Sequence, residues 1–172
     1  MAQVNVSPGY EFVDAVKSRD GGKAEQMLSE KAPGLINARG SDGDTALFVS
    51  IGRRDEGFTG FLLGKGADPN QTGKSGDTPL IVAARIGFEQ ATEWLLGVGA
   101  KVDATNKMGE TALITAVVQR QRPVVRMLLA AGANPDKTDT AAGYSARDYA
   151  KRDPRAREIL QMIEAKKPSA AN

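Results

Sequence analysis

The feature that most constrains the fold is a short phrase that returns at a fixed interval along the chain. Gly-Asp-Thr-Ala-Leu begins at Gly43, Gly-Asp-Thr-Pro-Leu at Gly76 and Gly-Glu-Thr-Ala-Leu at Gly109, so these glycines are 33 residues apart. A degraded copy, Gly-Tyr-Ser-Ala-Arg, begins 34 residues later at Gly143. A period of this length indicates one supersecondary unit stacked on copies of itself. The chain is therefore expected to form a solenoid, in which each unit buries apolar surface against its neighbours.

A second phrase, Leu-Leu-x-x-Gly-Ala, keeps the same period and begins at Leu62, Leu95 and Leu128. Each first phrase places a hydroxyl just before an apolar run, where a helix N-cap is favoured. Each second phrase ends near a glycine, which commonly follows the last turn of a helix because it adopts the left-handed conformation easily. Each unit is therefore predicted to contain a helix, a turn, a second helix and a β-turn finger. The predicted N-caps are Thr45, Thr78, Thr111 and Ser145, and the predicted helix ends are Gly66, Gly99 and Gly132.

These two phrases make the chain resemble the ankyrin repeat family, and its bacterial members in particular. The resemblance extends over about residues 10–163 and implies an all-α fold, a solenoid of stacked helix-turn-helix units with β-turn fingers. It implies about five repeats including two caps, whose outer faces must be more polar because they have no neighbour. The expected segments are an N-terminal extension (1–9), an N-terminal cap (10–42), repeats at 43–75, 76–108 and 109–142, a C-terminal cap (143–163) and a flexible tail (164–172).

The chain departs from the family in having no histidine. Members of the family commonly carry histidine after Thr-Pro-Leu, where it forms hydrogen bonds with threonine between units. Those positions are occupied here by Phe48, Ile81 and Ile114. We expect apolar packing at these positions to replace the missing hydrogen bonds, with less rigidity between neighbouring loops.

The absence of histidine and cysteine removes most routes to catalysis and to tightly bound metals. Serine or cysteine triads and the usual zinc sites need these residues, and disulfides need cysteine. Gly73-Lys74-Ser75 resembles the end of a phosphate-binding loop, but Asp68 stands where that loop requires glycine. We expect no cofactor and no metal, and an enzyme with a small-ligand site in a concave groove remains the alternative of a different class. The carboxylates are expected to be solvated surface charges, including Asp55, Glu56, Asp68, Asp77, Glu110 and Asp139.

The resemblance implies that the chain is a non-catalytic protein–protein interaction module, acting as a scaffold, an adaptor or an inhibitor. Partners of the family dock on the finger tips and on the exposed face of the first helix in each unit. We expect one protein partner of unknown identity and a monomeric chain. The residues expected to contact that partner are Arg53, Arg54, Thr72, Lys74, Asp77, Arg85, Lys107, Met108, Glu110, Gln119, Arg120, Thr138 and Thr140.

Arginines recur near the end of the first helix in several units and would form a ladder along one edge. Such a ladder could pair with an acidic partner, because a guanidinium binds a carboxylate through two parallel hydrogen bonds. It could also be a solubilising edge, or bind nucleic acid with an affinity that falls steeply with salt. The net charge of only +2 gives no general argument for nucleic acid. The ladder would comprise Arg53, Arg54, Arg85, Arg120, Arg122 and Arg152.

The sequence contains no run of about 18 apolar residues, so no membrane insertion is expected. Its start, Met1-Ala2-Gln3, is compatible with a signal peptide removed before Ala2 or Gln3 and with an ordinary cytosolic beginning. The absence of cysteine suits an oxidising compartment. We therefore prefer a periplasmic location to a cytoplasmic one, and both remain open.

Overall fold

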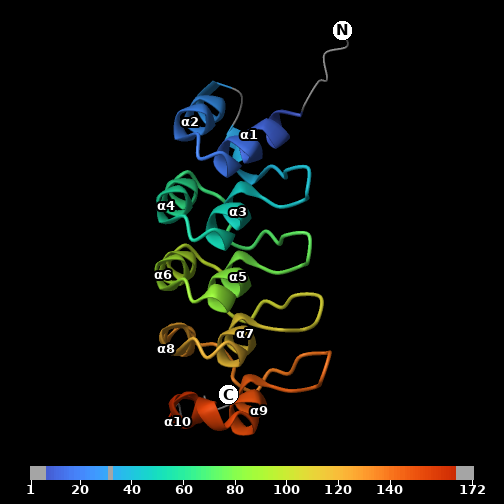
Figure 1. The fold of residues 1–172 in the computed structure, drawn as a ribbon, viewed down its shortest axis with the longest axis vertical. Coiled ribbons are helices and arrows are strands. Elements are labelled where there is room, and N and C mark those ends of the chain that lie inside the picture. Colours follow the sequence, from blue (N-terminus) through green and yellow to red (C-terminus); the bar gives the residue numbers. More distant parts are fainter. Residues whose placement is uncertain (1–6, 31–32, 166–172) are drawn as a thin grey trace.

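The computed structural model describes residues 7–30 and 33–165, which form a stack of helix pairs (Figure 1). The first helices of the pairs lie in one column and the second helices in another, and hairpin loops project from the first column away from the second (Figure 1). We call these loops finger 1 (38–45), finger 2 (71–78), finger 3 (104–111) and finger 4 (137–145). The pairs are α1 (Pro8–Lys17) with α2 (Gly21–Glu30), α3 (Ala46–Gly52) with α4 (Glu56–Gly64), α5 (Pro79–Ile86) with α6 (Glu89–Gly97), α7 (Ala112–Val118) with α8 (Arg122–Ala130), and α9 (Ala146–Arg152) with α10 (Arg157–Ala165).

The first-column helices begin where the hydroxyl residues predicted. Thr45, Thr78 and Thr111 each have an extended backbone, and each side-chain oxygen accepts a hydrogen bond of 3.2 Å from the backbone N–H three residues later. Ser145 does the same for α9 and completes a capping box with Asp148. These bonds satisfy N–H groups that have no partner inside the helix. The predicted N-caps are thus confirmed.

The predicted ends of the second-column helices are also confirmed. Gly66, Gly99 and Gly132 follow α4, α6 and α8, with φ of 85°, 94° and 94°. This left-handed geometry turns the chain toward the next finger. In the N-terminal unit the route differs, because a short 3-10 helix, η1 (Pro33–Asn37), leads into finger 1.

The core is continuous along the stack because each apolar position recurs in register. Leu47, Leu80 and Leu113 begin the buried face of the first column and are at most 1% exposed. Leu62, Leu95 and Leu128 of the second column are fully buried. No single unit could bury these faces alone, as a solenoid requires.

The positions that lack histidine are packed as expected. Ile81 and Ile114 are buried, and Phe48 lies against finger 2, where a Cβ added to Gly73 would come within 2.6 Å of its ring. The fingers are nevertheless joined by polar contacts that we did not predict. Three hydrogen bonds link neighbouring fingers. The backbone N–H of Lys74 donates to Asp44, the side-chain amide of Asn106 donates to Asp77, and the backbone N–H of Thr140 donates to the Met108 carbonyl.

A second set of polar contacts joins the loops that follow the second column. A side-chain oxygen in one unit accepts a hydrogen bond from the backbone N–H found 31 residues later in the next unit. This bond occurs at the same phase in three successive junctions, so it fixes the spacing of the units along that side. It joins Asn37 to Asp68, Asn70 to Lys101 and Asp103 to Asn134, at 2.8, 2.8 and 2.9 Å.

The terminal helices extend slightly beyond the expected domain. α1 begins at Pro8, two residues before the expected cap, because proline is well suited to the first turn of a helix. α10 continues to Ala165, so residues 164–165 of the expected tail are helical. Arg147 replaces the leucine of the other units and instead bonds Asp136 at 2.6 and 3.2 Å. Residues 1–6 and 166–172, which make up most of the expected extension and tail, lie outside the described residues.

Candidate partner-binding face

The residues expected to contact a partner lie in two regions. Most belong to the finger face, which we define as fingers 1–4 together with the exposed side of α3, α5, α7 and α9 (Figure 1). On this face lie Thr72, Lys74, Asp77, Arg85, Lys107, Met108, Glu110, Thr138 and Thr140. The turns that join the two columns contain the other four, Arg53, Arg54, Gln119 and Arg120.

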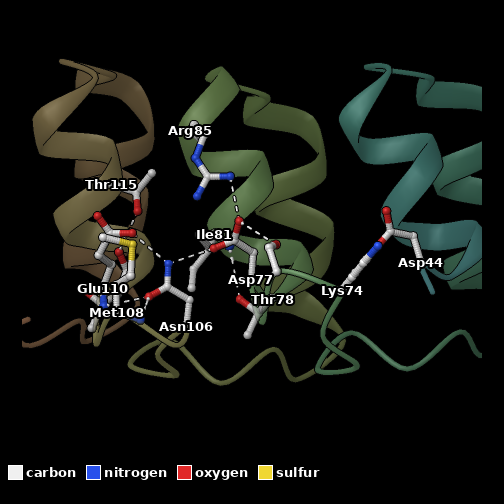
Figure 2. Close-up of polar contacts among 12 residues, drawn as sticks. Asp44, Lys74, Asp77, Thr78, Ile81, Arg85, Asn106, Met108, Glu110 and Thr115 are labelled. Atoms are coloured by element: carbon white, nitrogen blue, oxygen red, sulfur yellow. Dashed lines mark hydrogen bonds and ion pairs between the residues drawn. The ribbon is translucent and has the colours of Figure 1, made fainter. Parts of the chain in front are cut away.

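Asp77 lies at the centre of the finger face and is buried, with its side chain 8% exposed. It accepts hydrogen bonds from Arg85 at 2.8 Å, Asn106 at 2.8 Å and Ser75 at 3.2 Å (Figure 2). Burial alone would raise the pKa of Asp77, but the bonds from Arg85 and Asn106 outweigh it and hold the pKa below its usual range. The expectation that Asp77 is a solvated surface charge was therefore wrong.

Asn106 joins finger 2 to finger 3. Its amide nitrogen donates to Asp77 at 2.8 Å and to Glu110 at 2.7 Å (Figure 2). Its amide oxygen accepts from the backbone N–H groups of Met108 at 2.9 Å and Glu110 at 3.0 Å. One side chain thus separates two carboxylates and shapes its own finger. Sequence reasoning missed this residue, although a signal existed, because the equivalent positions in the two preceding units are Gly40 and Gly73.

Asp139 anchors finger 4 in a similar way. It is 4% exposed, and it accepts from the Tyr149 hydroxyl at 2.6 Å and from the backbone N–H groups of Ala142 and Gly143 at 2.7 and 2.9 Å. Burial acts to raise the pKa of Asp139, but these hydrogen bonds outweigh it and lower the pKa. Asp139 is thus a second carboxylate that we wrongly expected to be solvated. The hydrogen bond to Asp139 raises the pKa of Tyr149 to about 12.

We expect the Tyr149 hydroxyl to make stability depend on alkaline pH. The fold favours the protonated phenol, since its pKa rises from 10.0 to about 12. The stabilisation is therefore complete below about pH 10 and is lost as the pH rises toward 12. Tyr149→Phe has no phenol to ionise, so it should not lose this stabilisation at alkaline pH. Its free energy of unfolding at neutral pH should be about 1 kcal/mol lower than that of the parent. Thermal unfolding between pH 7 and 12 measures both effects. Tyr144→Phe is the control, and an unchanged alkaline limb in Tyr149→Phe would contradict the assignment.

The arginines of the predicted ladder bond within the chain. Arg53 donates to the carbonyl of Lys17. Arg85 and Arg122 pair with Asp77 and Glu158 at 2.8 and 2.5 Å. The guanidinium of Arg152 instead lies over the ring of Tyr144, 4.0 Å from its centroid. These side chains are therefore held in place before any partner arrives.

The turns between the columns carry arginines that reach the next unit. Arg54 donates to the carbonyl of Ile86 at 2.6 Å, and Arg120 pairs with Asp153 at 2.8 Å. Their backbones are left-handed, with φ of 54° and 55°. That conformation costs a non-glycine residue about 1–2 kcal/mol. The turn is thus kept at the expense of backbone strain. Arg19, with φ of 58°, likewise pairs with Asp55 of the next unit.

Two substitutions of Arg120 should separate the salt bridge from the backbone strain. Arg120→Ala loses the bridge and keeps the strain, so it should unfold about 0.5–1 kcal/mol more easily, as expected for a partly exposed pair. Arg120→Gly loses the same bridge but relieves about 1 kcal/mol of left-handed strain, so its stability should stay near that of the parent. Urea unfolding measures both, with Arg126→Ala on α8 as the control. A glycine variant less stable than the alanine variant would contradict this account.

Two cavities in the part of the chain that the structure describes lie away from the finger face. One of about 580 Å³ is lined by Arg19, Arg54 and Phe58 beside α2 and α4, and another of about 530 Å³ by Trp94, Val98 and neighbouring glycines on α4 and α6. Trp94 is half-buried, and its ring lies against Gly60. Over residues 7–30 and 33–165, no three or more metal-ligating side chains gather into a set that could hold a metal ion. In the same residues, no helix combines the length and apolar character that crossing a bilayer requires.

Comparison with known proteins agrees with the geometry. A family model described as ankyrin repeats (3 copies) matches residues 54–139, half of the chain. The matched part contains α5 to α8 and fingers 2 and 3, and therefore the cluster around Asp77 and Asn106. A search of curated proteins gave no significant match.

Proposed function

The chain belongs to the ankyrin repeat family, and on that premise we propose that it is a non-catalytic module that binds one protein partner as a scaffold, adaptor or inhibitor. Repeats of this family are generally protein–protein interaction modules and are typically not enzymes. The proposal places the docking site on the finger face and treats the chain as a monomer. The partner contacts proposed are those named above for that face.

The observation that supports this face most strongly is its combination of rigidity and exposed apolar side chains. Met108 at the tip of finger 3 is 52% exposed, and Val118 at the end of α7 is 43% exposed. The hydrogen bonds of Asn106 hold finger 3 to finger 2 (Figure 2). A surface that is already ordered loses less conformational entropy on binding. Methionine and arginine are also enriched at protein interfaces.

We do not propose that the chain binds nucleic acid along the arginine ladder. Binding to a phosphate backbone needs several basic side chains whose charge is free to neutralise phosphates. Arg85, Arg120 and Arg122 are instead paired with carboxylates of the chain. These pairings give all three residues a structural contribution, although Arg85 uses only Nη1 in its pairing and keeps Nε and Nη2 for a further acceptor.

Site-specific photocrosslinking tests the proposed face. A benzophenone amino acid is introduced at Met108 and, as a matched control, at Val98, which is 50% exposed but follows α6 in the second column. The two positions differ in face and not in exposure. After irradiation in cells that express the chain natively, we expect protein adducts from position 108 and none from position 98. Adducts from position 98 alone would contradict the proposed face.

A further inference from the structure

Three equivalent positions on successive first-column helices form a row on the finger face. Arg85, Val118 and Arg152 lie at the ends of α5, α7 and α9 and are separated by 33 and 34 residues, one repeat each. Packed helices are about 8–10 Å apart, so these side chains follow one another at about that spacing. We call these three residues the Arg85–Val118–Arg152 row.

The two arginines of the row retain hydrogen-bonding capacity. Arg85 pairs with Asp77 through Nη1 and is 39% exposed, which leaves Nε and Nη2 available. Arg152 uses the face of its guanidinium against the ring of Tyr144, which leaves its N–H edge open. Within the described residues, the side chain of Arg152 makes no hydrogen bond or ion pair. An exposed apolar side chain, Val118, lies between these two cations.

The carboxylates around the row already have donors. Asp77 is bonded by Arg85 and Asn106, Asp139 by Tyr149, and Asp153 by Arg120. Glu110 accepts from the amide of Asn106. The row therefore offers N–H donors on either side of an apolar contact. Charge complementarity points to a ligand with carboxylates that flank an apolar side chain.

We infer, building on the proposed function, that the partner docks an extended acidic segment along the Arg85–Val118–Arg152 row. An apolar side chain of the segment packs on Val118, and carboxylates on both sides of it bind Arg85 and Arg152. A chain in the polyproline II conformation advances about 3.1 Å per residue and has three residues per turn, so every third side chain lies on the same side, about 9 Å apart, which matches one step of the row. The segment thus carries a carboxylate, two residues, an apolar residue, two residues and a second carboxylate. The guanidinium of Arg152 can donate two parallel hydrogen bonds to such a carboxylate.

A random heptapeptide library displayed on phage, selected on the full immobilised chain, tests this inference. We expect enriched peptides to carry aspartate or glutamate at the first and seventh positions and an apolar residue at the fourth. A synthetic copy of the best peptide should bind Arg152→Ala about tenfold more weakly, because a charge-assisted hydrogen bond is lost. Val118→Ser should weaken binding about threefold to fivefold through lost apolar contact. Both positions are exposed, so the variants should fold, and circular dichroism checks this. Arg126→Ala, on the other column, should bind as the parent does.

The outcomes separate this inference from the proposed function. Enriched peptides that are basic or neutral, or that bind Arg152→Ala as tightly as the parent, would overturn the acidic segment. If such peptides lose affinity with Met108→Ser, the finger face still binds proteins and only the inference fails. If the parent binds random-sequence DNA and Arg152→Ala does not, the row binds nucleic acid. That result would also overturn the inference of an acidic segment. Photocrosslinks from position 98 alone would overturn the proposed function itself.

Discussion

Asn106→Asp is expected to lower the free energy of unfolding by about 3 kcal/mol at neutral pH. The amide nitrogen of Asn106 lies 2.8 Å from a carboxylate oxygen of Asp77 and 2.7 Å from one of Glu110. An aspartate would place a third carboxylate oxygen at that point, where no donor remains between the three groups. Like charges at this distance cannot all stay ionised without a large cost.

The penalty in Asn106→Asp should depend on pH with a definite sign. Crowding raises the pKa of the new carboxyl in the folded state above its unfolded value, so the protonated form is compatible with the fold. The variant should therefore approach the parent at about pH 4 and differ most from it at neutral pH. Urea unfolding at several pH values measures this. Asn106→Ala should cost about 2 kcal/mol with little dependence on pH, because it removes bonds without adding charge.

Asn70→Asp is the matched control for Asn106→Asp. Asn70 also links two units, but its shorter bond is made by its oxygen, which accepts from the backbone N–H of Lys101 at 2.8 Å, whereas its amide nitrogen donates to the Gly99 carbonyl at 3.3 Å. In the next unit Asp103 makes the same contact to Asn134 as an aspartate. Asn70→Asp should thus change stability by no more than about 0.5 kcal/mol. Equal losses at positions 70 and 106 would show that the separation of carboxylates is not what Asn106 contributes.

Gly109→Ala is expected to destabilise the chain by about 3–4 kcal/mol, far more than the same change at Gly43. Both glycines have positive φ, 75° and 87°, and occupy the same phase of the repeat. A Cβ on Gly109 would lie 2.6 Å from the backbone nitrogen of Thr140, which donates to the Met108 carbonyl at 2.9 Å. Relief of this clash requires finger 4 to move away from finger 3.

Gly43→Ala serves as the control because only backbone strain applies there. The nearest atom to its added Cβ would be Cβ of Lys74 at 3.6 Å, an ordinary contact. The expected cost is about 1 kcal/mol, that of a left-handed alanine. Urea unfolding gives the free energies, and limited proteolysis within finger 4 should be faster in Gly109→Ala only. Similar costs at the two positions would contradict the close packing of fingers 3 and 4.

The helices could be predicted from the sequence because their signals act over a few residues. A hydroxyl such as Thr78 bonds the N–H three residues later, and Gly99 turns the chain directly after α6. Neither signal needs a distant partner. The residues proposed to contact a partner lie on the fingers, helix ends and turns, but Asp77, one of them, is buried, and so is Asp139, which was expected to be a solvated charge.

Several of the contacts that were missed join residues from different units. Asn106 bonds a carboxylate 29 residues away, and Arg120 bonds one 33 residues away. Such partners are brought together only by the stacking distance and by side-chain direction. A solvated carboxylate cannot be told from a buried, hydrogen-bonded one in a sequence, because both are written as aspartate.

The sequence by itself determined the repeat, the phase of its helices and turns, and the absence of histidine and cysteine chemistry. It could do so because repeated local signals reinforce one another along the chain. Only the tertiary structure decided which charged side chains are paired within the molecule and which remain available to bind a partner. That outcome depends on distances between neighbouring units, and at those distances Asn106 holds two carboxylates apart while Arg152 is left with an open N–H edge.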